Sequence, residues 1–201
     1  MPPGTLLKQE EFLMSFAPRK LIGMLLLAGM LAAAPATITY AQDAAAVAAA
    51  AAAATDPLLA GADAERGKEV FAKVGVCVSC HGWDGDGTGK NPRSEGAAAL
   101  LRESQLDAAG FKEIISCGIP GTPMPYHDSQ AYKDDRCYGM TADMFEPGQE
   151  PHKGKAIKPE DIINLVAYIQ THIQGKPKAT YEDCADYFGA SAEKACAFMK
   201  Q

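Results

Sequence analysis

The chain has 201 residues, a formal net charge of −6 and six cysteines. This length accommodates one small domain with extensions at its ends. An acidic surface repels the phosphate backbone, so nucleic acid is excluded as the expected partner.

Residues 1–41 have the pattern of a secretory signal peptide. Arg19 and Lys20 precede an apolar run over residues 21–36, and Thr39-Tyr40-Ala41 offers small residues for cleavage. The pattern predicts export to the periplasm of a Gram-negative type of cell. A membrane span needs about 20 apolar residues, so contact with the membrane is expected only if the segment stays uncleaved. Cleavage removes three basic and two acidic side chains, and the mature chain stays acidic. That charge either steers the protein to a basic redox partner or only maintains solubility.

An alanine-rich linker is predicted over residues 42–60. Residues 44–54 are all alanine except Val47, and such a tract has no amphipathic face to bury. A folded domain is expected over residues 61–175, followed by a C-terminal extension over residues 176–201.

Three helices are predicted in the domain. The first covers residues 63–73 with Asp63 as its N-cap, and Gly67 inside it would allow a close helix crossing. The second covers residues 104–116, where apolar side chains would cover a cofactor or the core. The third follows Lys158. The apolar residues of the second helix are Phe111, Ile114 and Ile115, and those of the third are Ile162, Leu165, Val166, Ile169 and Ile173. No strand pattern occurs, which predicts an all-α fold with long loops.

The segment Cys77-Val78-Ser79-Cys80-His81 is the attachment signature of a c-type haem. Cys77 and Cys80 lie three residues apart, so one helical turn places both sulfurs on one side, where they can form thioethers. His81 would then supply the proximal iron ligand. A zinc site would need a second ligand pair, and a thioredoxin-type dithiol would need a preceding strand. The chain shows neither.

A loop rich in proline and glycine, residues 118–125, contains Met124. A thioether on a stiff loop is a suitable distal ligand because it stabilises Fe(II) and raises the reduction potential. The alternative is that Met124 only packs on the surface. His127 is the main competitor for the iron. His152, His172, Met140 and Met144 are weaker candidates.

Residues 62–174 resemble a class I cytochrome c. The shared features are Gly67 and Phe71, the Cys77–His81 motif with Gly82, the glycine-rich residues 84–89, Pro123-Met124-Pro125, and Leu165 to Ile169 with Tyr168. The resemblance implies a class I cytochrome c fold with one covalent haem c. It makes Cys77 and Cys80 the anchors, His81 the proximal ligand and Met124 the distal ligand.

The insert between Met124 and Lys158 and the tail resemble a narrower group, the periplasmic cytochromes of bacterial methanol and alcohol oxidation. The segment that carries this likeness is Asp134-Asp135-Arg136-Cys137-Tyr138-Gly139-Met140. It implies a one-electron carrier rather than an enzyme. The expected donor is a quinone-cofactor (PQQ) dehydrogenase, and the acceptor a terminal oxidase or another cytochrome. The alternatives are a haem-bearing subunit of an oxidoreductase complex, and a haem enzyme or gas-binding protein with an open distal site.

Four further cysteines predict two disulfides in an oxidising compartment. Three pairings are possible, and we favour Cys117 with Cys137 and Cys184 with Cys196. The first pair would brace the loop that contains Met124. The alternative for Cys117 is a buried free thiol.

Residues 84–95 match several positions of an EF-hand calcium loop, from Asp84 to Glu95. Pro92 falls inside the loop, and Asn91 replaces the usual apolar residue. We therefore do not expect calcium to bind there.

Overall fold

The structure is a computed structural model that describes residues 47–48, 51, 53, 55–89 and 98–200. The predicted signal and part of the alanine-rich linker lie outside these residues. The described residues form helices and no strand, which confirms the all-α prediction. Apart from the helices, Tyr126 with Lys153 and Cys137 with Met140 form isolated β-bridges. None of the helices in the described ranges is long and apolar enough to cross a membrane.

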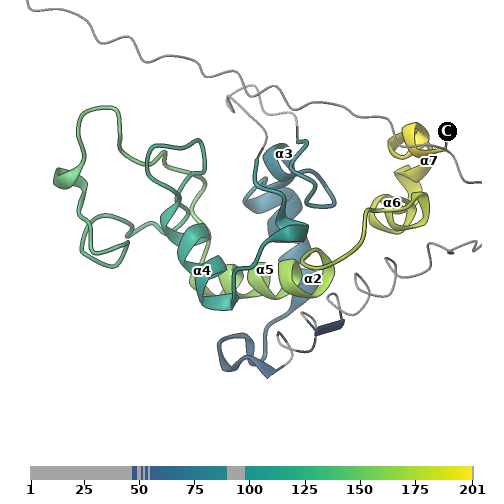
Figure 1. Ribbon diagram of the computed structural model, residues 1–201, viewed down its shortest axis with the longest axis horizontal. Coiled ribbons are helices and arrows are strands. Elements are labelled where there is room, and N and C mark those ends of the chain that lie inside the picture. Colours follow the sequence, from purple (N-terminus) through teal and green to yellow (C-terminus); the bar gives the residue numbers. More distant parts are fainter. Residues whose placement is uncertain (1–46, 49–50, 52, 54, 90–97, 201) are drawn as a thin grey trace, which may run out of the picture. The chain divides into compact units, whose positions relative to one another are not determined.

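The α-helices are α2 (Ala64–Glu69), α3 (Val78–His81), α4 (Ala108–Cys117), α5 (Pro159–His172), α6 (Tyr181–Phe188) and α7 (Ala192–Ala195), and Figure 1 shows their arrangement. A π-helical turn, Val70–Val74, follows α2 directly. Single 3-10 turns cover Pro57–Leu59, Leu101–Glu103, Ala142–Met144, Gly189–Ser191 and Ala197–Met199.

Helices α2 and α5 cross at Gly67, as predicted. A Cβ atom at Gly67 would lie 2.0 Å from the carbonyl oxygen of Asn164 and 2.7 Å from the Cβ of Tyr168. Only a residue without a side chain fits between the two backbones at this distance. Beside the crossing, the rings of Phe71 and Tyr168 pack with their centroids 5.7 Å apart.

Polar contacts fix the same crossing at its outer edge. The Arg66 guanidinium donates two hydrogen bonds of 2.8 Å to the Asp161 carboxylate. These bonds lower the pKa of Asp161 below its ordinary value. The backbone N–H of Asp63 donates to Oδ1 of Asn164 at 2.8 Å. The first and last helices of the domain are therefore joined by both packing and charge.

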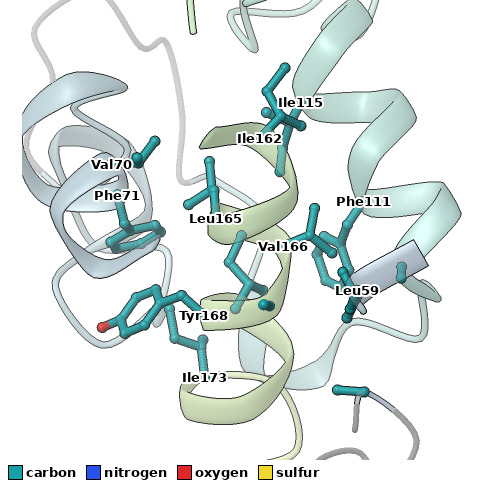
Figure 2. Close-up of a cluster of buried hydrophobic side chains, with 14 of the residues drawn as sticks. Leu59, Val70, Phe71, Phe111, Ile115, Ile162, Leu165, Val166, Tyr168 and Ile173 are labelled. Carbon is teal, nitrogen blue, oxygen red and sulfur yellow. The ribbon is translucent and has the colours of Figure 1, made fainter. Parts of the chain in front are cut away.

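The core forms around the apolar stripe of α5 (Figure 2). All five predicted stripe residues are buried: Ile162, Leu165, Val166, Ile169 and Ile173. From α4, Phe111 and Ile115 join this core. Leu59 is also buried in it, so the core includes a residue from the range predicted as linker.

Two predicted helices differ in extent from the observed ones. The helix predicted over residues 63–73 continues beyond Glu69 as the π turn, in which the N–H of Gly75 bonds the carbonyl of Val70. The helix predicted over residues 104–116 begins only at Ala108. Asp107 is the N-cap, and its carboxylate accepts the N–H of Gly110 at 2.8 Å.

The tail forms a small helical unit of its own. Helix α6 starts with a capping box, in which Thr180 and Asp183 each accept a hydrogen bond from the other's backbone N–H. Trp83 contacts the tail through Tyr187 and Phe188, at ring-centroid distances of 5.4 and 5.8 Å.

Candidate haem site

The six cysteines fall into two classes. Cys117 is bridged to Cys137 and Cys184 to Cys196, which confirms the favoured pairing and excludes a free thiol at Cys117. Cys77 and Cys80 form no disulfide. The two disulfides therefore do not use the thiols of the motif.

Helix α3 is the single turn that carries the motif. Cys77 is its N-cap, and the N–H groups of Cys80 and His81 bond the Cys77 carbonyl at 3.1 and 2.9 Å. Residues three apart in such a turn share one face. The structure therefore gives the two cysteines the local arrangement that the spacing predicts.

His81 is held through one ring nitrogen. Its Nδ1 lies 3.0 Å from the carbonyl oxygen of Ala99. A carbonyl only accepts, so Nδ1 carries the proton and Nε2 keeps a lone pair for a metal. Burial lowers the pKa of His81, which favours the neutral ring that can bind iron. No sequence pattern indicates Ala99, because its contact with His81 is made by a backbone carbonyl, which every residue has.

The sulfur of Cys77 is desolvated, which raises the pKa of its thiol to about 12. A Cβ atom at Gly75 would lie 2.9 Å from this sulfur and 3.1 Å from Cδ1 of Ile157. The glycine therefore leaves space beside the sulfur that a larger residue would fill.

The Met124 loop is non-helical and closed on itself. The N–H of Ile119 donates to the Met124 carbonyl at 3.2 Å, and the Met124 N–H donates to Oγ1 of Thr122 at 3.2 Å. A Cβ atom at Gly118 would lie 2.7 Å from the backbone of Pro125 and Tyr126. The start and end of the loop are thus in contact, and Met124 is partly exposed.

The His127 ring is buried and packed against backbone. Its side chain is only 5 % exposed, and its Nδ1 donates to the Lys155 carbonyl at 2.7 Å. A Cβ atom at Gly154 would lie 2.7 Å from Cε1 of the ring. Burial lowers the pKa of His127, so this ring is neutral and packed among backbone.

The weaker ligand candidates lie in other environments. His152 is exposed, and His172 stacks on Tyr168 with ring centroids 5.2 Å apart. Met144 is 60 % exposed. Met140 lines a cavity of about 400 Å³ beside α4, together with Ile114, Ile119 and Tyr138.

A cavity of about 1070 Å³ lies beside the tail and is lined by Trp83, Tyr187 and Phe198 among others. None of Cys77, Cys80, His81 and Met124 lines it. We therefore do not assign the haem to this cavity.

The glycine-rich segment after the motif uses its carboxylates internally. Asp84 pairs with Arg102, and Asp86 accepts the N–H and hydroxyl of Thr88 at 2.9 and 2.6 Å. The second half of the segment that partly matches an EF-hand loop, including Asn91, Pro92 and Glu95, lies outside the described residues.

A family model for cytochrome c matches residues 64–172, which is more than half of the chain and includes the Cys77–His81 motif and Met124. The chain belongs to the cytochrome c family. Membership means a covalently bound haem c and a role as a haem-based electron carrier with redox proteins as partners. The residues of the motif fit a haem c. Two thiols and a histidine whose Nε2 keeps its lone pair lie on one helical turn. No curated protein and no solved structure showed significant similarity to the chain.

Proposed function

We propose that this cytochrome is a periplasmic one-electron carrier whose haem is anchored by Cys77 and Cys80 and ligated by His81 and Met124. The observation that carries the proposal is the His81 hydrogen bond to the Ala99 carbonyl, within the matched family region. It orients a neutral imidazole next to the two motif thiols.

The haem iron, when bound, supplies the change between Fe(III) and Fe(II). The protein residues hold the ligands in one arrangement in both states. Ala99 keeps the His81 tautomer fixed, and the closed 118–125 loop limits how far Met124 can move. Little reorganisation then accompanies electron transfer, and no catalytic residue is needed.

Access to the donor atom supports Met124 over His127 as the distal ligand. An iron ligand must present its donor atom to the porphyrin face. Met124 is partly exposed, whereas the His127 side chain is only 5 % exposed and its ring lies against Gly154. Recruitment of His127 would require moving the ring out of this packing.

Export to the periplasm is supported by the signal-like residues 1–41 and by the two disulfides, which persist in oxidising compartments. N-terminal sequencing of the mature protein would test it. A start near residue 42 is expected, and a mature chain that retains residues 1–41 would contradict cleavage.

A quinone-cofactor alcohol or methanol dehydrogenase is the proposed electron donor, and a terminal oxidase or another cytochrome the acceptor. Support comes from the segment 134–140, which resembles that of cytochromes in alcohol oxidation. In this segment Arg136 bonds Asp134 at 2.7 Å, and Tyr138 bonds the Gly118 carbonyl. Mixing the ferric protein with such dehydrogenases and their alcohols should reduce its haem. No reduction above the rate without dehydrogenase would contradict this donor.

The ligand assignment is tested by the visible spectrum of the ferric protein. The wild type should be low-spin with the weak far-red band of sulfur bound to iron. Met124→Leu should lose this band, whereas Met144→Leu, at an exposed position, should keep it. A band that survives in Met124→Leu would contradict the assignment. A high-spin wild type that shifts readily with cyanide would favour an open distal site instead.

A further inference from the structure

The insert that follows the Met124 loop supplies hydrogen-bond donors to the last carbonyls of α4. The Ser116 carbonyl accepts the N–H groups of His127 and Asp128, at 3.1 and 3.0 Å. These carbonyls belong to the last turn of a helix, which has no partners of its own for them. The insert therefore completes the end of α4, from which the Met124 loop departs.

The next two carbonyls are bound by tyrosine hydroxyls. The Tyr132 hydroxyl donates to the Cys117 carbonyl at 2.6 Å, and the Tyr138 hydroxyl donates to the Gly118 carbonyl at 2.7 Å. Cys117 is the last residue of α4, and Gly118 is the first residue of the loop. Two phenols thus hold two consecutive peptide groups at the point where helix becomes loop.

Both tyrosines have a backbone conformation that bulky residues rarely adopt. Their φ angles are +61° for Tyr132 and +58° for Tyr138. Such a conformation carries an energetic cost for a residue with a large side chain and persists only where surrounding contacts enforce it. The two hydroxyl bonds and the Cys117–Cys137 bridge tie this stretch of the insert to the end of α4.

Burial and ring packing hold Tyr132 in place for its hydrogen bond to the Cys117 carbonyl. Tyr132 is 5 % exposed, and its ring packs edge-on against Tyr126 and Phe145, at centroid distances of 5.7 and 5.1 Å. Burial raises its pKa to about 12, so the phenol keeps its proton across the neutral range. The ring of Tyr126, the residue directly after the loop, therefore contacts the same tyrosine whose hydroxyl binds the Cys117 carbonyl directly before the loop.

We propose that Tyr132 and Tyr138 are positioning residues that keep the Met124 loop closed and so control how readily another ligand displaces the methionine sulfur. This inference rests on the proposed role of Met124. When the loop is closed, the Cys117 carbonyl is buried and depends on the Tyr132 hydroxyl. When the loop opens, water can satisfy that carbonyl. Loss of the hydroxyl therefore weakens the closed state relative to the open one.

The experiment is imidazole titration of the full-length ferric holoprotein, followed by loss of the far-red sulfur band. In Tyr132→Phe the apparent affinity for imidazole should rise about tenfold, the usual effect of one unsatisfied buried acceptor. In Tyr138→Phe, whose residue is 39 % exposed, the rise should be about threefold. Tyr181→Phe is the matched control, because its ring contacts Lys200 in the tail. Its imidazole affinity should equal that of the wild type.

Thermal unfolding of each variant separates positioning from general stability. A purely structural role would lower the unfolding midpoint and leave imidazole affinity unchanged, which would overturn the inference. If Tyr132→Phe yields no haem-loaded protein, Tyr138→Phe decides on the same criterion. A wild type that lacks the sulfur band would overturn the Met124 assignment and this inference together. A normal wild-type band with variants within twofold of it would overturn the inference alone.

Discussion

The insert and the tail each contain a disulfide, but the two bridges connect different things. Cys117–Cys137 joins the end of α4 to the insert over a separation of 20 residues, and Cys184–Cys196 joins α6 to the segment after α7 over 12 residues. The first closes a loop that contains Met124. The second closes the tail on itself. The disulfide of the insert therefore constrains the loop of the proposed ligand, whereas the disulfide of the tail constrains only the tail.

Two helix-ending glycines give the sharpest test of this difference. Gly118 ends α4 with φ +66°, and Gly189 ends α6 with φ +52°. A Cβ atom at Gly118 would meet the backbone of Pro125 at 2.7 Å, whereas nothing lies within 4 Å of one at Gly189. Gly118→Ala should lower the free energy of unfolding by about 4 kcal/mol, since backbone strain and a collision add.

Gly118→Ala should also weaken the far-red band, because the collision separates the two ends of the Met124 loop. Gly189→Ala should lower the free energy of unfolding by only about 1 kcal/mol and leave the band unchanged. Denaturant titration and the ferric spectrum measure both effects. Equal behaviour of the two variants would show that the loop contact at Gly118 has no influence on the ligand.

Removal of the insert disulfide should have the next largest effect. The double variant Cys117→Ser with Cys137→Ser should lose about 3 kcal/mol of unfolding free energy, because the unfolded chain regains the freedom of the open loop. Its imidazole affinity should rise, since one tie between insert and α4 is gone. A variant that is destabilised but binds imidazole like the wild type would show that the bridge does not influence the binding of Met124 to iron.

The corresponding tail variant should behave differently. Cys184→Ser with Cys196→Ser should increase proteolytic cleavage after residue 176, because α6 and α7 lose their mutual tie. The haem domain should lose less than about 1 kcal/mol, since the bridge joins only residues of the tail and the tail can unfold locally. Limited proteolysis with mass spectrometry locates the cleavage. Loss of haem-domain stability equal to that of the insert variant would contradict a separate tail.

Acid should loosen the tail while leaving the insert's hold on α4 in place. The hydrogen bonds from Thr180 lower the pKa of Asp183 below its ordinary value. Its stabilising contribution is therefore complete above the ordinary aspartate pKa and is lost as pH falls through the lowered value. The expected loss is below about 1 kcal/mol at this solvent-screened site.

The insert's ties to α4 through Tyr132, Tyr138 and Cys137 carry no charge that such acid would alter. NMR signals of the α6 amides should therefore change at a higher pH than those of residues 117–119. The reverse order would contradict the assignment of the acid-sensitive contact to the tail. Asp183→Asn, which removes the titrating carboxylate, serves as the control and should abolish the pH dependence of α6.

Much of the helical scaffold was predictable because its signals are local. Asp63 as N-cap, the α5 stripe and the close approach at Gly67 follow from residue type and spacing. The helix boundaries were less predictable, because the chain after Glu69 continues as a π turn and Asp107, rather than an earlier residue, caps α4. Leu59 joined the core through packing that the alanine-rich pattern did not indicate.

The sequence by itself determined that two cysteines and a histidine share one helical turn and that two further cysteine pairs exist, because these features depend on residue chemistry and short spacing. Only the tertiary structure decided that Ala99 orients His81 and that His127 is buried beside Gly154 and Lys155. It also decided that Tyr132 and Tyr138 bind the two carbonyls at the start of the Met124 loop. The physical reason is that the partners are backbone groups, which every residue has. Chain folding alone determines which of them a given side chain reaches.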